Sequence, residues 1–181
     1  RLAAAGVRVP RPYAFCQGVV LMELVTDADG HAAPRLNDVA LSEETALAYH
    51  ALMIRQIVRM LCAGIIHGDL SEYNVLVDRD GPVIIDLPQA VDAAGNNNAS
   101  AMLQRDADNI TAYFSRFAPA LASTQFGKEI WARYERGALT EDAVLTGHVD
   151  AETRAADVAA VLREVGDVEA EHEARLRYKA L

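Results

Sequence analysis

The sequence predicts a mainly helical α+β fold, and two observations point that way. Between residues 42 and 64 the apolar side chains recur at spacings of three and four, which is the period of a helix with one buried face. Beyond Gly64 the period becomes two, with short β-branched runs at residues 75–77 and 83–85 that indicate strands. This change of period predicts a long helix followed by a small antiparallel hairpin.

Composition indicates a globular domain and excludes some classes of function. The chain has 181 residues, of which 51% are hydrophobic and 24% charged, an ordinary balance for a folded protein. Its net charge of −9 argues against a general nucleic-acid-binding protein. No apolar run approaches the roughly 20 residues that span a bilayer, so no membrane association is expected.

The number and surroundings of the cysteines indicate the redox state of the compartment in which the protein resides. Cys16 and Cys62 are too few for a disulfide framework. Both lie in apolar stretches, so we expect buried thiols in a reducing compartment. No signal-peptide pattern opens the chain, which favours a cytoplasmic location.

The first third of the chain predicts a β-hairpin. Two apolar runs, at residues 13–16 and 18–25, are joined by the turn sequence Gln17-Gly18. Residues 26–34 are rich in Asp, Gly and His and are expected to form a loop.

The central helix is predicted to begin after Ser42, a good N-cap residue. Glu43 and Glu44 then suit the positive end of the helix dipole. Gly64 is the stop signal. The predicted buried face consists of Leu47, Ala51, Ile54, Val58 and Leu61.

The remaining segments predict a second hairpin and three more helices. The turn sequence at residues 78–81 separates the two β-branched runs, so the hairpin is expected to lie against the central helix. Residues 90–99 are expected to form a loop, after which Ser100 is expected to cap a helix. Further helices are expected at residues 125–136 and from residue 151 to the end.

Candidate catalytic residues flank the second hairpin. The loop ahead of it presents Asp69 and then Asn74, and the hairpin ends at Asp86. Phosphoryl transfer from ATP needs a carboxylate that accepts the hydroxyl proton, and oxygen ligands that hold Mg²⁺ on the phosphates. Asp69, Asn74 and Asp86 supply that set, in the order of the catalytic and metal loops of protein kinases.

Taken singly, each of these residues has a simpler interpretation. An aspartate followed five positions later by an asparagine is usually an ordinary turn, and Asp86 fits the end of a strand. The combination, with His-Gly-Asp-Leu in front and Ile-Ile-Asp behind, favours an active site.

These motifs resemble the RIO family of atypical serine/threonine protein kinases, and within it the bacterial branch. The likeness rests on HGDLSEYNVLV at residues 67–77 and IIDLPQAV at residues 84–91. Residues 5–12 resemble the entry to the family's hinge strands, and residues 105–109 resemble the helix that supports the catalytic loop. The resemblance covers residues 4–117.

The resemblance implies a protein-kinase-like fold, mainly its helical C-terminal lobe together with the hinge strands of the N-terminal lobe. Asp69 would be the catalytic aspartate, and Asn74 and Asp86 would bind Mg²⁺. In this family the aspartate that matches Asp86 can also accept phosphate itself, so Asp86 is a second candidate catalytic residue.

The resemblance also implies where ATP would bind. Met22 falls at the gatekeeper position, and Glu23 and Val25 would offer backbone groups to adenine. From the residues alone, this stretch fits a plain buried strand equally well. Ser71 stands where many protein kinases have a lysine, and it could bond a phosphate oxygen, bond the Asp69 carboxylate or shape the turn.

Parts of the family's ATP site are missing from this sequence. No Gly-rich loop and no ATP-anchoring lysine precede the hinge, and little room for an activation segment follows Asp86. The resemblance therefore implies an N-terminally truncated kinase that is nearly inactive alone. Its expected parts are a remnant of the N-terminal lobe and hinge at residues 1–25, a C-terminal lobe at 26–150 and a helical extension at 151–181.

The leading hypothesis is a RIO-type phosphotransferase that uses ATP and Mg²⁺ and phosphorylates serine or threonine of an unidentified protein, with autophosphorylation or slow ATP hydrolysis as further activities. One alternative is a small-molecule kinase of the aminoglycoside type, but those usually carry His and Gly where this chain has Ser71-Glu72-Tyr73. The other is an ATP-regulated scaffold without transfer activity. A ribosome-assembly partner is implied by the resemblance only.

Overall fold

Helix α1 (Glu43–Cys62) is the longest element of the part of the chain that the structure describes. The computed structural model describes residues 1–148. The side chain of Ser42 accepts a 3.1 Å hydrogen bond from the backbone N–H of Thr45, so the predicted N-cap is confirmed. The helix and domain predicted from residue 151 onward lie outside the described residues.

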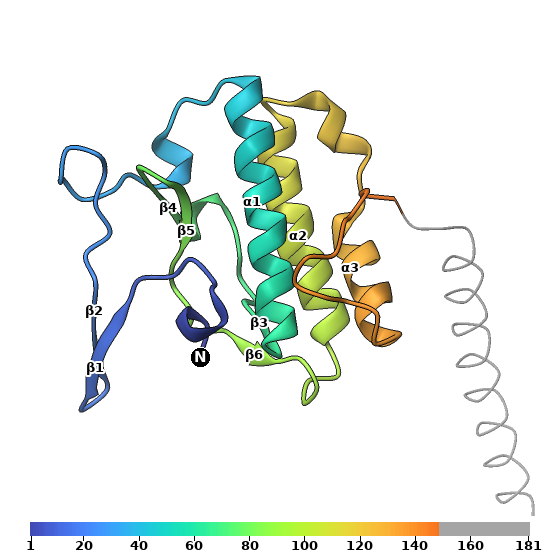
Figure 1. The fold of residues 1–181 in the computed structure, drawn as a ribbon, viewed down its shortest axis with the longest axis horizontal. Coiled ribbons are helices and arrows are strands. Elements are labelled where there is room, and N and C mark those ends of the chain that lie inside the picture. The colour runs from blue at the N-terminus through green and yellow to red at the C-terminus, as the bar shows by residue number, and fades with distance from the viewer. Residues whose placement is uncertain (149–181) are drawn as a thin grey trace, which may run out of the picture. The chain divides into compact units, whose positions relative to one another are not determined.

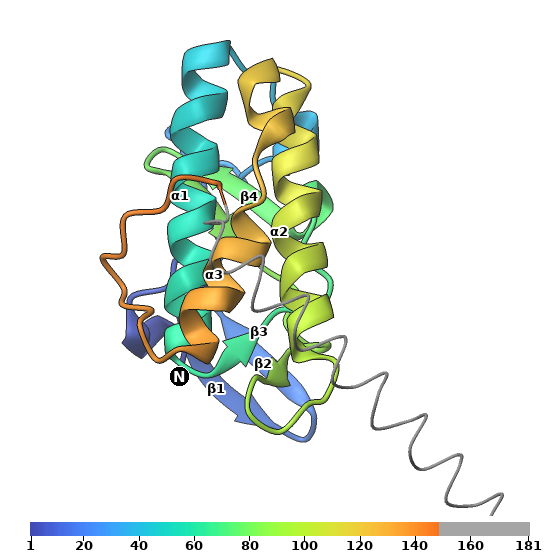
Figure 2. The same ribbon diagram turned by 90° about the vertical axis from the view of Figure 1, so that its right-hand side faces the viewer.

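Two further helices pack beside α1, namely α2 (Ala99–Ser115) and α3 (Phe126–Glu135). Figures 1 and 2 show α3 on one side of the α1–α2 pair and the second hairpin on the opposite side. No helix within residues 1–148 has both the length and the apolar character needed to cross a bilayer.

The strands of residues 1–148 form three antiparallel pairs. Both predicted hairpins are present. The pairs are β1 (Pro12–Cys16) with β2 (Val19–Met22), β3 (Ile65–Ile66) with β6 (Val91–Asp92), and β4 (Val75–Asp78) with β5 (Gly81–Ile84). Strand β5 packs against α1, as predicted, and the mixed content of helix and strand confirms the α+β class.

Short 3₁₀ helices complete the described part of the chain. They are η1 (Ala3–Ala5), η2 (Leu36–Asp38), η3 (Glu72–Asn74) and η4 (Pro119–Ser123). The hydroxyl of Tyr113 on α2 donates a 2.8 Å hydrogen bond to the carbonyl of Leu36, which fixes η2 against the helices.

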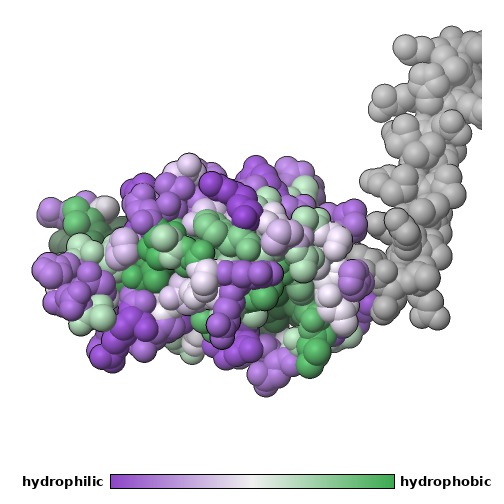
Figure 3. Space-filling view, turned by 90° about the horizontal axis from the view of Figure 1, so that it is seen from above, coloured by the Kyte–Doolittle hydropathy of each residue, from purple (hydrophilic) through white to green (hydrophobic). Residues whose placement is uncertain are grey.

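The hydrophobic core lies between the helices and the β4–β5 hairpin. Its largest fully buried side chains are Leu36, Met53, Leu61, Ile66, Leu70, Ile84, Leu103, Ile110, Phe114 and Ile130. On the face seen in Figure 3, hydrophobic residues reach the surface in separate patches between hydrophilic ones.

The prediction of buried cysteine thiols is wrong. Cys16 and Cys62 are both exposed and free. Cys16 ends β1, in a hairpin that is exposed along its whole length, and Cys62 is the last residue of α1. Apolar neighbours in the sequence therefore do not predict burial at either cysteine.

The predicted buried face of α1 is partly wrong. Leu47 is 41% exposed and Ala51 is also exposed, whereas His50 is only 3% exposed. His50 packs against Phe114 of α2 and Phe126 of α3. Because two helices pack against α1, its buried face is wider than a single row of apolar residues. This face includes His50 and leaves out Leu47 and Ala51.

Two boundaries also differ from the prediction. Helix α2 begins at Ala99 after Asn98, so Ser100 lies inside the helix and does not cap it. The Ser100 hydroxyl accepts a 3.0 Å hydrogen bond from the side chain of Gln104 one turn later. Strand β2 ends at Met22, and the predicted loop at residues 90–99 contains β6.

Candidate active site

The loop with the candidate catalytic residues leaves α1 through a sharp turn. Gly64 has a φ of 73°, a left-handed conformation that glycine adopts without strain. Strand β3 follows and pairs with β6, so the chain between them, with Asp69, Asn74 and Asp86, starts and ends at the same small sheet.

Asp106 of α2 fixes the backbone of this loop. Its carboxylate accepts hydrogen bonds from the N–H of Gly68 (2.8 Å) and from the N–H of Leu70 (3.0 Å). Asp106 is only 1% exposed, and burial raises the pKa of its carboxyl, although the two backbone N–H groups act in the opposite direction. Asp106 therefore braces the loop, as the resemblance of residues 105–109 to a supporting helix implied.

Two more α2 side chains hold the same stretch. Arg105 donates to the carbonyl of Gly68, and Asn109 donates to the carbonyl of Leu70 (3.1 Å). With Asp106 they bond the backbone on both sides of Asp69. The side chain of Asp69 is exposed and bonds no other group within residues 1–148, so its carboxylate is held in place by its backbone and is open to a substrate.

Position 68 requires glycine, because any side chain there would be strained and would overlap its neighbours. Its φ is 84°, and a Cβ atom there would lie 2.7 Å from the terminal methyl of Met102 and 2.8 Å from the carbonyl oxygen of Gln89. The chain after Asp86 therefore passes directly over the loop at Gly68.

Asn74 connects the loop with the segment that leads to Asp86. Its side-chain amide donates a 2.8 Å hydrogen bond to the carbonyl of Asp69, and its own carbonyl accepts a 3.0 Å hydrogen bond from the N–H of Ile85. The side-chain oxygen of Asn74 bonds no other group in the described range and remains available as a ligand.

The buried side chain of His67 also connects these two segments. Its Nε2 lies 2.9 Å from the Ile85 carbonyl, and its Nδ1 lies 3.3 Å from the backbone N of Asp69. A carbonyl can only accept and a backbone N–H can only donate, so in this arrangement Nε2 of His67 is the donor and Nδ1 is the acceptor. It is 2% exposed, and both of its ring nitrogens are used within the protein, so its role is structural.

Asp86 has an unusual backbone conformation. Its φ is 65°, which is uncommon for a residue other than glycine. Because Ile85 is bonded on both sides, to Asn74 and to His67, the chain is fixed immediately before Asp86. Its carboxylate is exposed, like that of Asp69.

Ser71 lies between Asp69 and Asn74. It is the N-cap residue of η3, and its carbonyl accepts a 3.0 Å hydrogen bond from the N–H of Asn74. Its hydroxyl makes no hydrogen bond within residues 1–148, so a structural role for this side chain has no support there.

The hinge residues offer two backbone groups to a ligand. The N–H of Glu23 is bonded to the carbonyl of Arg11, and the carbonyl of Val25 accepts from the N–H of Ala33. Within the described range, the carbonyl of Glu23 and the N–H of Val25 have no partner. An acceptor and a donor two residues apart match the amino group and the ring nitrogen on one edge of adenine.

The hinge region lies in a cleft of its own. A cavity of about 510 Å³ is lined by Glu23 and Val25 together with Arg8, Asp78 and residues of the 26–30 loop. Asp69, Asn74 and Asp86 are not among its lining residues. Met22 and Glu23 are exposed, and Val25 is 8% exposed, so the interpretation of residues 22–25 as a plain buried strand is wrong for most of it.

Arg8 is the residue that sequence reasoning missed. Its guanidinium binds both carboxylate oxygens of Asp78, at 2.6 and 2.7 Å, and donates to the carbonyl of Pro82. Its backbone carbonyl accepts from the N–H of Ile84. A charged residue between Val7 and Val9 was the available signal, because a lone charge in an extended apolar stretch needs a partner.

Comparisons with known proteins point to one family. A family model described as RIO domain matches residues 1–126. The RIO-type serine/threonine-protein kinase Rio1 of Haloferax volcanii is 43% identical over 117 residues, which are 64% of this chain and 39% of that protein. The serine/threonine-protein kinase rio1 of Schizosaccharomyces pombe is 33% identical over 149 residues, 81% of this chain and 29% of that protein.

A third relative has a similar extent. The RIO-type serine/threonine-protein kinase Rio1 of Thermoplasma acidophilum is 35% identical over 115 residues, 64% of this chain and 58% of that protein. The chain thus spans between 29% and 58% of the length of these relatives.

Proposed function

The chain belongs to the RIO family and has its protein-kinase-like α+β fold, and from this premise we propose that it carries the metal-binding and catalytic loops of an ATP-dependent serine/threonine protein kinase. The curated relatives are named serine/threonine-protein kinases, which supports a protein hydroxyl over a small molecule as the phosphate acceptor. Membership of the bacterial branch and a cytoplasmic location are parts of this proposal.

The observation that carries the proposal is the position of Asn74. Its amide is bonded to the backbone of Asp69, and its carbonyl is bonded to the backbone next to Asp86. One residue therefore links the two candidate carboxylates, which are 17 positions apart in the sequence (86 − 69). Both carboxylates are exposed and without a protein partner within residues 1–148.

The donor set fits Mg²⁺. This ion prefers carboxylate and amide oxygens and keeps several water ligands. The Asp86 carboxylate and the Asn74 side-chain oxygen are of the right type, and neither is occupied by a protein donor in the described range. When bound there, Mg²⁺ would neutralise charge on the phosphates of ATP.

Asp69 would act on the substrate hydroxyl. As the hydroxyl oxygen forms its bond to the γ-phosphorus, the bond from that phosphorus to the β-phosphate oxygen breaks and ADP leaves. The hydroxyl proton passes to the Asp69 carboxylate. The role of Asp86 as a phosphate acceptor in autophosphorylation remains a secondary part of the proposal.

The hinge supports adenine binding. The unpartnered Glu23 carbonyl would accept from the adenine amino group, and the unpartnered Val25 N–H would donate to a ring nitrogen. Met22 would lie beside the ring, and Ser71 would contact a phosphate. This sequence holds no Gly-rich loop ahead of the hinge, so we expect weak ATP binding and little turnover from these 181 residues alone.

Calorimetric titration of the 181-residue chain with ATP, with and without Mg²⁺, tests the proposal. Asp86→Asn should weaken binding in Mg²⁺ by roughly tenfold or more and leave binding without Mg²⁺ almost unchanged. Asp69→Asn should have a smaller effect, and Asp142→Asn, an exposed site elsewhere, should have none. Wild-type Mg²⁺ dependence in Asp86→Asn would rule out the metal assignment.

A further inference from the structure

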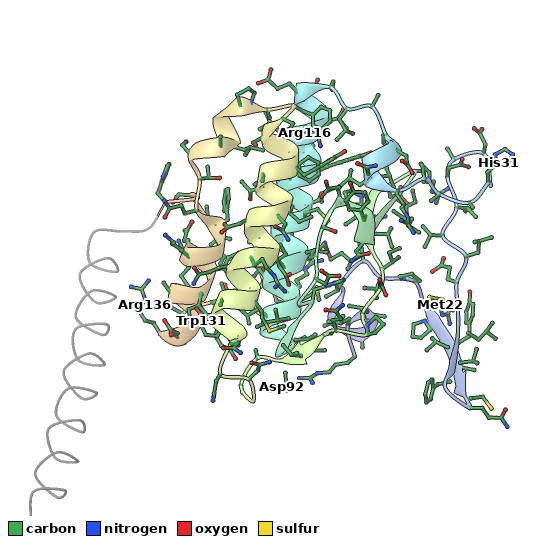
Figure 4. The ribbon with its side chains drawn as sticks, turned by 180° about the vertical axis from the view of Figure 1, so that it is seen from behind. Met22, His31, Asp92, Arg116, Trp131 and Arg136 are labelled. Carbon is green, nitrogen blue, oxygen red and sulfur yellow. The ribbon has the colours of Figure 1, made fainter. Side chains whose placement is uncertain are left out.

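The position of the hinge depends on the segments that join it to the helices. Figures 1 and 4 show the β1–β2 hairpin, with Met22 at its end, standing apart from the helices. On the side that precedes the hairpin, the N–H of Glu23 donates to the carbonyl of Arg11 (2.9 Å), and the N–H of Arg11 donates to the Glu23 carboxylate (3.0 Å). The first hinge residue is therefore held by the backbone at Arg11.

A short and stiff connection links Arg11 to Arg8. Only Val9 and Pro10 lie between them. The ring of Pro10 fixes its own φ and restricts Val9 to extended conformations. A displacement of Arg8 would therefore be passed on to Arg11 and to the hinge.

The backbone of Arg8 is bonded on both sides. Its N–H donates a 2.8 Å hydrogen bond to the side-chain oxygen of Gln56, which is 2% exposed on α1. Its carbonyl accepts a 2.8 Å hydrogen bond from the N–H of Ile84. Because Ile84 stands two positions before Asp86, the chain at Arg8 lies beside the strand that leads to this candidate metal ligand.

The side chain of Arg8 holds the turn of the same β4–β5 hairpin. Its guanidinium bonds both carboxylate oxygens of Asp78, at 2.6 and 2.7 Å, and its Nε donates to the carbonyl of Pro82 (3.1 Å). The side chains of Arg8 and Asp78 are 30% and 21% exposed. Paired hydrogen bonds between charged groups are strong and fix orientation as well as distance. By contrast, the ion pair between Arg79 and Asp80 is 75% and 62% exposed, and exposed pairs contribute little.

We propose that Arg8 is a positioning residue for ATP, which acts through its ion pair with Asp78. This pair holds the hinge at a fixed distance from Asp86, so that one ATP molecule meets the adenine-binding groups and the metal ligands together. Two weak sites on a rigid frame bind a ligand that spans them more tightly than either site binds its own half, provided that their spacing is right. The inference rests on the proposed function and adds the residue that sets this spacing.

A second connection of the hinge limits the size of the effect. The carbonyl of Val25 accepts from the N–H of Ala33, and the carbonyl of Pro34 accepts from the N–H of Val77, both at 2.9 Å. This route joins the far end of the hinge to β4. Removal of the Arg8 side chain should therefore loosen the hinge without releasing it, and the expected loss of ATP affinity is partial.

NMR titration of the isotope-labelled 181-residue chain with three probes tests the inference. The probes are adenosine, tripolyphosphate with Mg²⁺, and ATP with Mg²⁺. Arg8→Gln should weaken the binding of ATP by roughly three- to tenfold, whereas adenosine and tripolyphosphate should each bind as they do to the wild type. Arg79→Gln removes an equal charge beside the same turn and should leave all three affinities unchanged.

The partner of Arg8 provides an independent test. Asp78→Asn should weaken ATP binding as Arg8→Gln does, and the double variant should lose no more than either single variant, because both changes act through one ion pair. Circular dichroism shows whether each variant is folded. Arg8→Lys keeps the charge but cannot bond Asp78 and Pro82 in the same fork, so it replaces Arg8→Gln if that variant unfolds.

The possible failures are distinguishable. An Arg8 variant that binds ATP as the wild type does, or that weakens all three probes equally, would overturn the positioning role, since equal weakening means a general loss of structure. A wild-type chain that binds none of the probes would contradict the proposed function, and the inference with it.

Discussion

Asp106 on α2 and Gly68 in the candidate catalytic loop are joined by a 2.8 Å hydrogen bond from the backbone N–H to the buried carboxylate. The second oxygen of the same carboxylate accepts from Leu70. Asp69 lies between Gly68 and Leu70, and its side chain needs no contact of its own to be held in place. The helix therefore fixes the loop, and the side chain of Asp69 stays free for chemistry.

Replacing Asp106 by asparagine should weaken this connection. An amide offers one acceptor oxygen where the carboxylate offers two, so one backbone N–H would face the amide NH₂ and lose its partner. Hydrogen bonds to a charged acceptor contribute about 1.5–3 kcal/mol, and we expect Asp106→Asn to lower the free energy of unfolding by that amount. Urea denaturation measures it. Asp108→Asn on the exposed side of α2 is the matched control, and equal losses in the two variants would contradict the bracing role.

Gly68→Ala should be more destabilising than an alanine at another left-handed glycine. Gly137 has a φ of 64° with no atom within 4 Å of its would-be Cβ, so Gly137→Ala measures backbone strain alone, about 1–2 kcal/mol. At Gly68 the Cβ would also overlap Met102 and Gln89, which raises the expected loss to about 2–5 kcal/mol. Thermal or urea unfolding of both variants compares them. Similar losses would mean that the chain at Gln89 moves aside easily.

His50 should make the protein less stable in acid. Burial lowers its pKa to about 4, from 6.5 when unfolded, so the unfolded chain binds more protons between these values. The stability that neutral His50 contributes is fully present above pH 6.5 and is lost as the pH falls to 4, a change on the order of 3 kcal/mol. His50→Gln should remove this part of the pH dependence of the melting temperature.

The exposed His31 provides the control for that experiment. His31→Gln should leave the pH dependence of the wild type in place, because its ring is open to solvent. The side chains in direct contact with the His50 ring are Thr111, bonded at 3.0 Å, Phe114 and Phe126, none of which titrates in this range. Glu141 and Asp142 line the same cavity as His50, so their Gln and Asn variants are included in the comparison. A His50→Gln variant that loses stability in acid as steeply as the wild type would show that other groups are responsible.

Much of the fold could be predicted because its signals are local. The cap at Ser42, the turns of both hairpins and the helix that follows Ser42 each depend on neighbours in the sequence, and all of them are confirmed. Only the exact buried face of that helix differs from the prediction. The loop motif around Asp69 also predicted the family, which the comparisons confirm. The roles of its individual residues stay predictions.

The rest depends on contacts between distant residues. Strands β3 and β6 have two residues each, too few to show any period, and they form only because they pair with each other. The hydrogen bonds from Arg8 to Asp78 span 70 positions, and no local pattern predicts them. The apolar neighbours of Cys16 predicted a buried thiol, but a sequence pattern does not specify what covers a side chain, and the structure leaves Cys16 exposed.

The last prediction concerns the chemical role of Asp69. Its carboxylate is exposed and its backbone is fixed, so Asp69→Ala should remove the proton acceptor without disturbing the hinge or the metal ligands. General-base groups typically contribute about 10²–10⁴-fold in rate, and we expect a loss of that size in phosphoryl transfer. ATP affinity should stay within a few-fold of the wild type. Ser71→Ala should cost less, because one neutral hydrogen bond contributes roughly 0.5–1.5 kcal/mol.

Single-turnover assays with labelled ATP measure this loss, with the protein in excess over nucleotide and both transfer to protein and release of phosphate recorded. Because these 181 residues hold no Gly-rich loop or anchoring lysine before the hinge, the comparison is repeated in a longer chain that adds both elements. Calorimetry on the same samples separates a loss of binding from a loss of chemistry. If the rates of Asp69→Ala equal those of the wild type in the longer chain, Asp69 is not the proton acceptor and the kinase mechanism fails, while the membership of the RIO family stands.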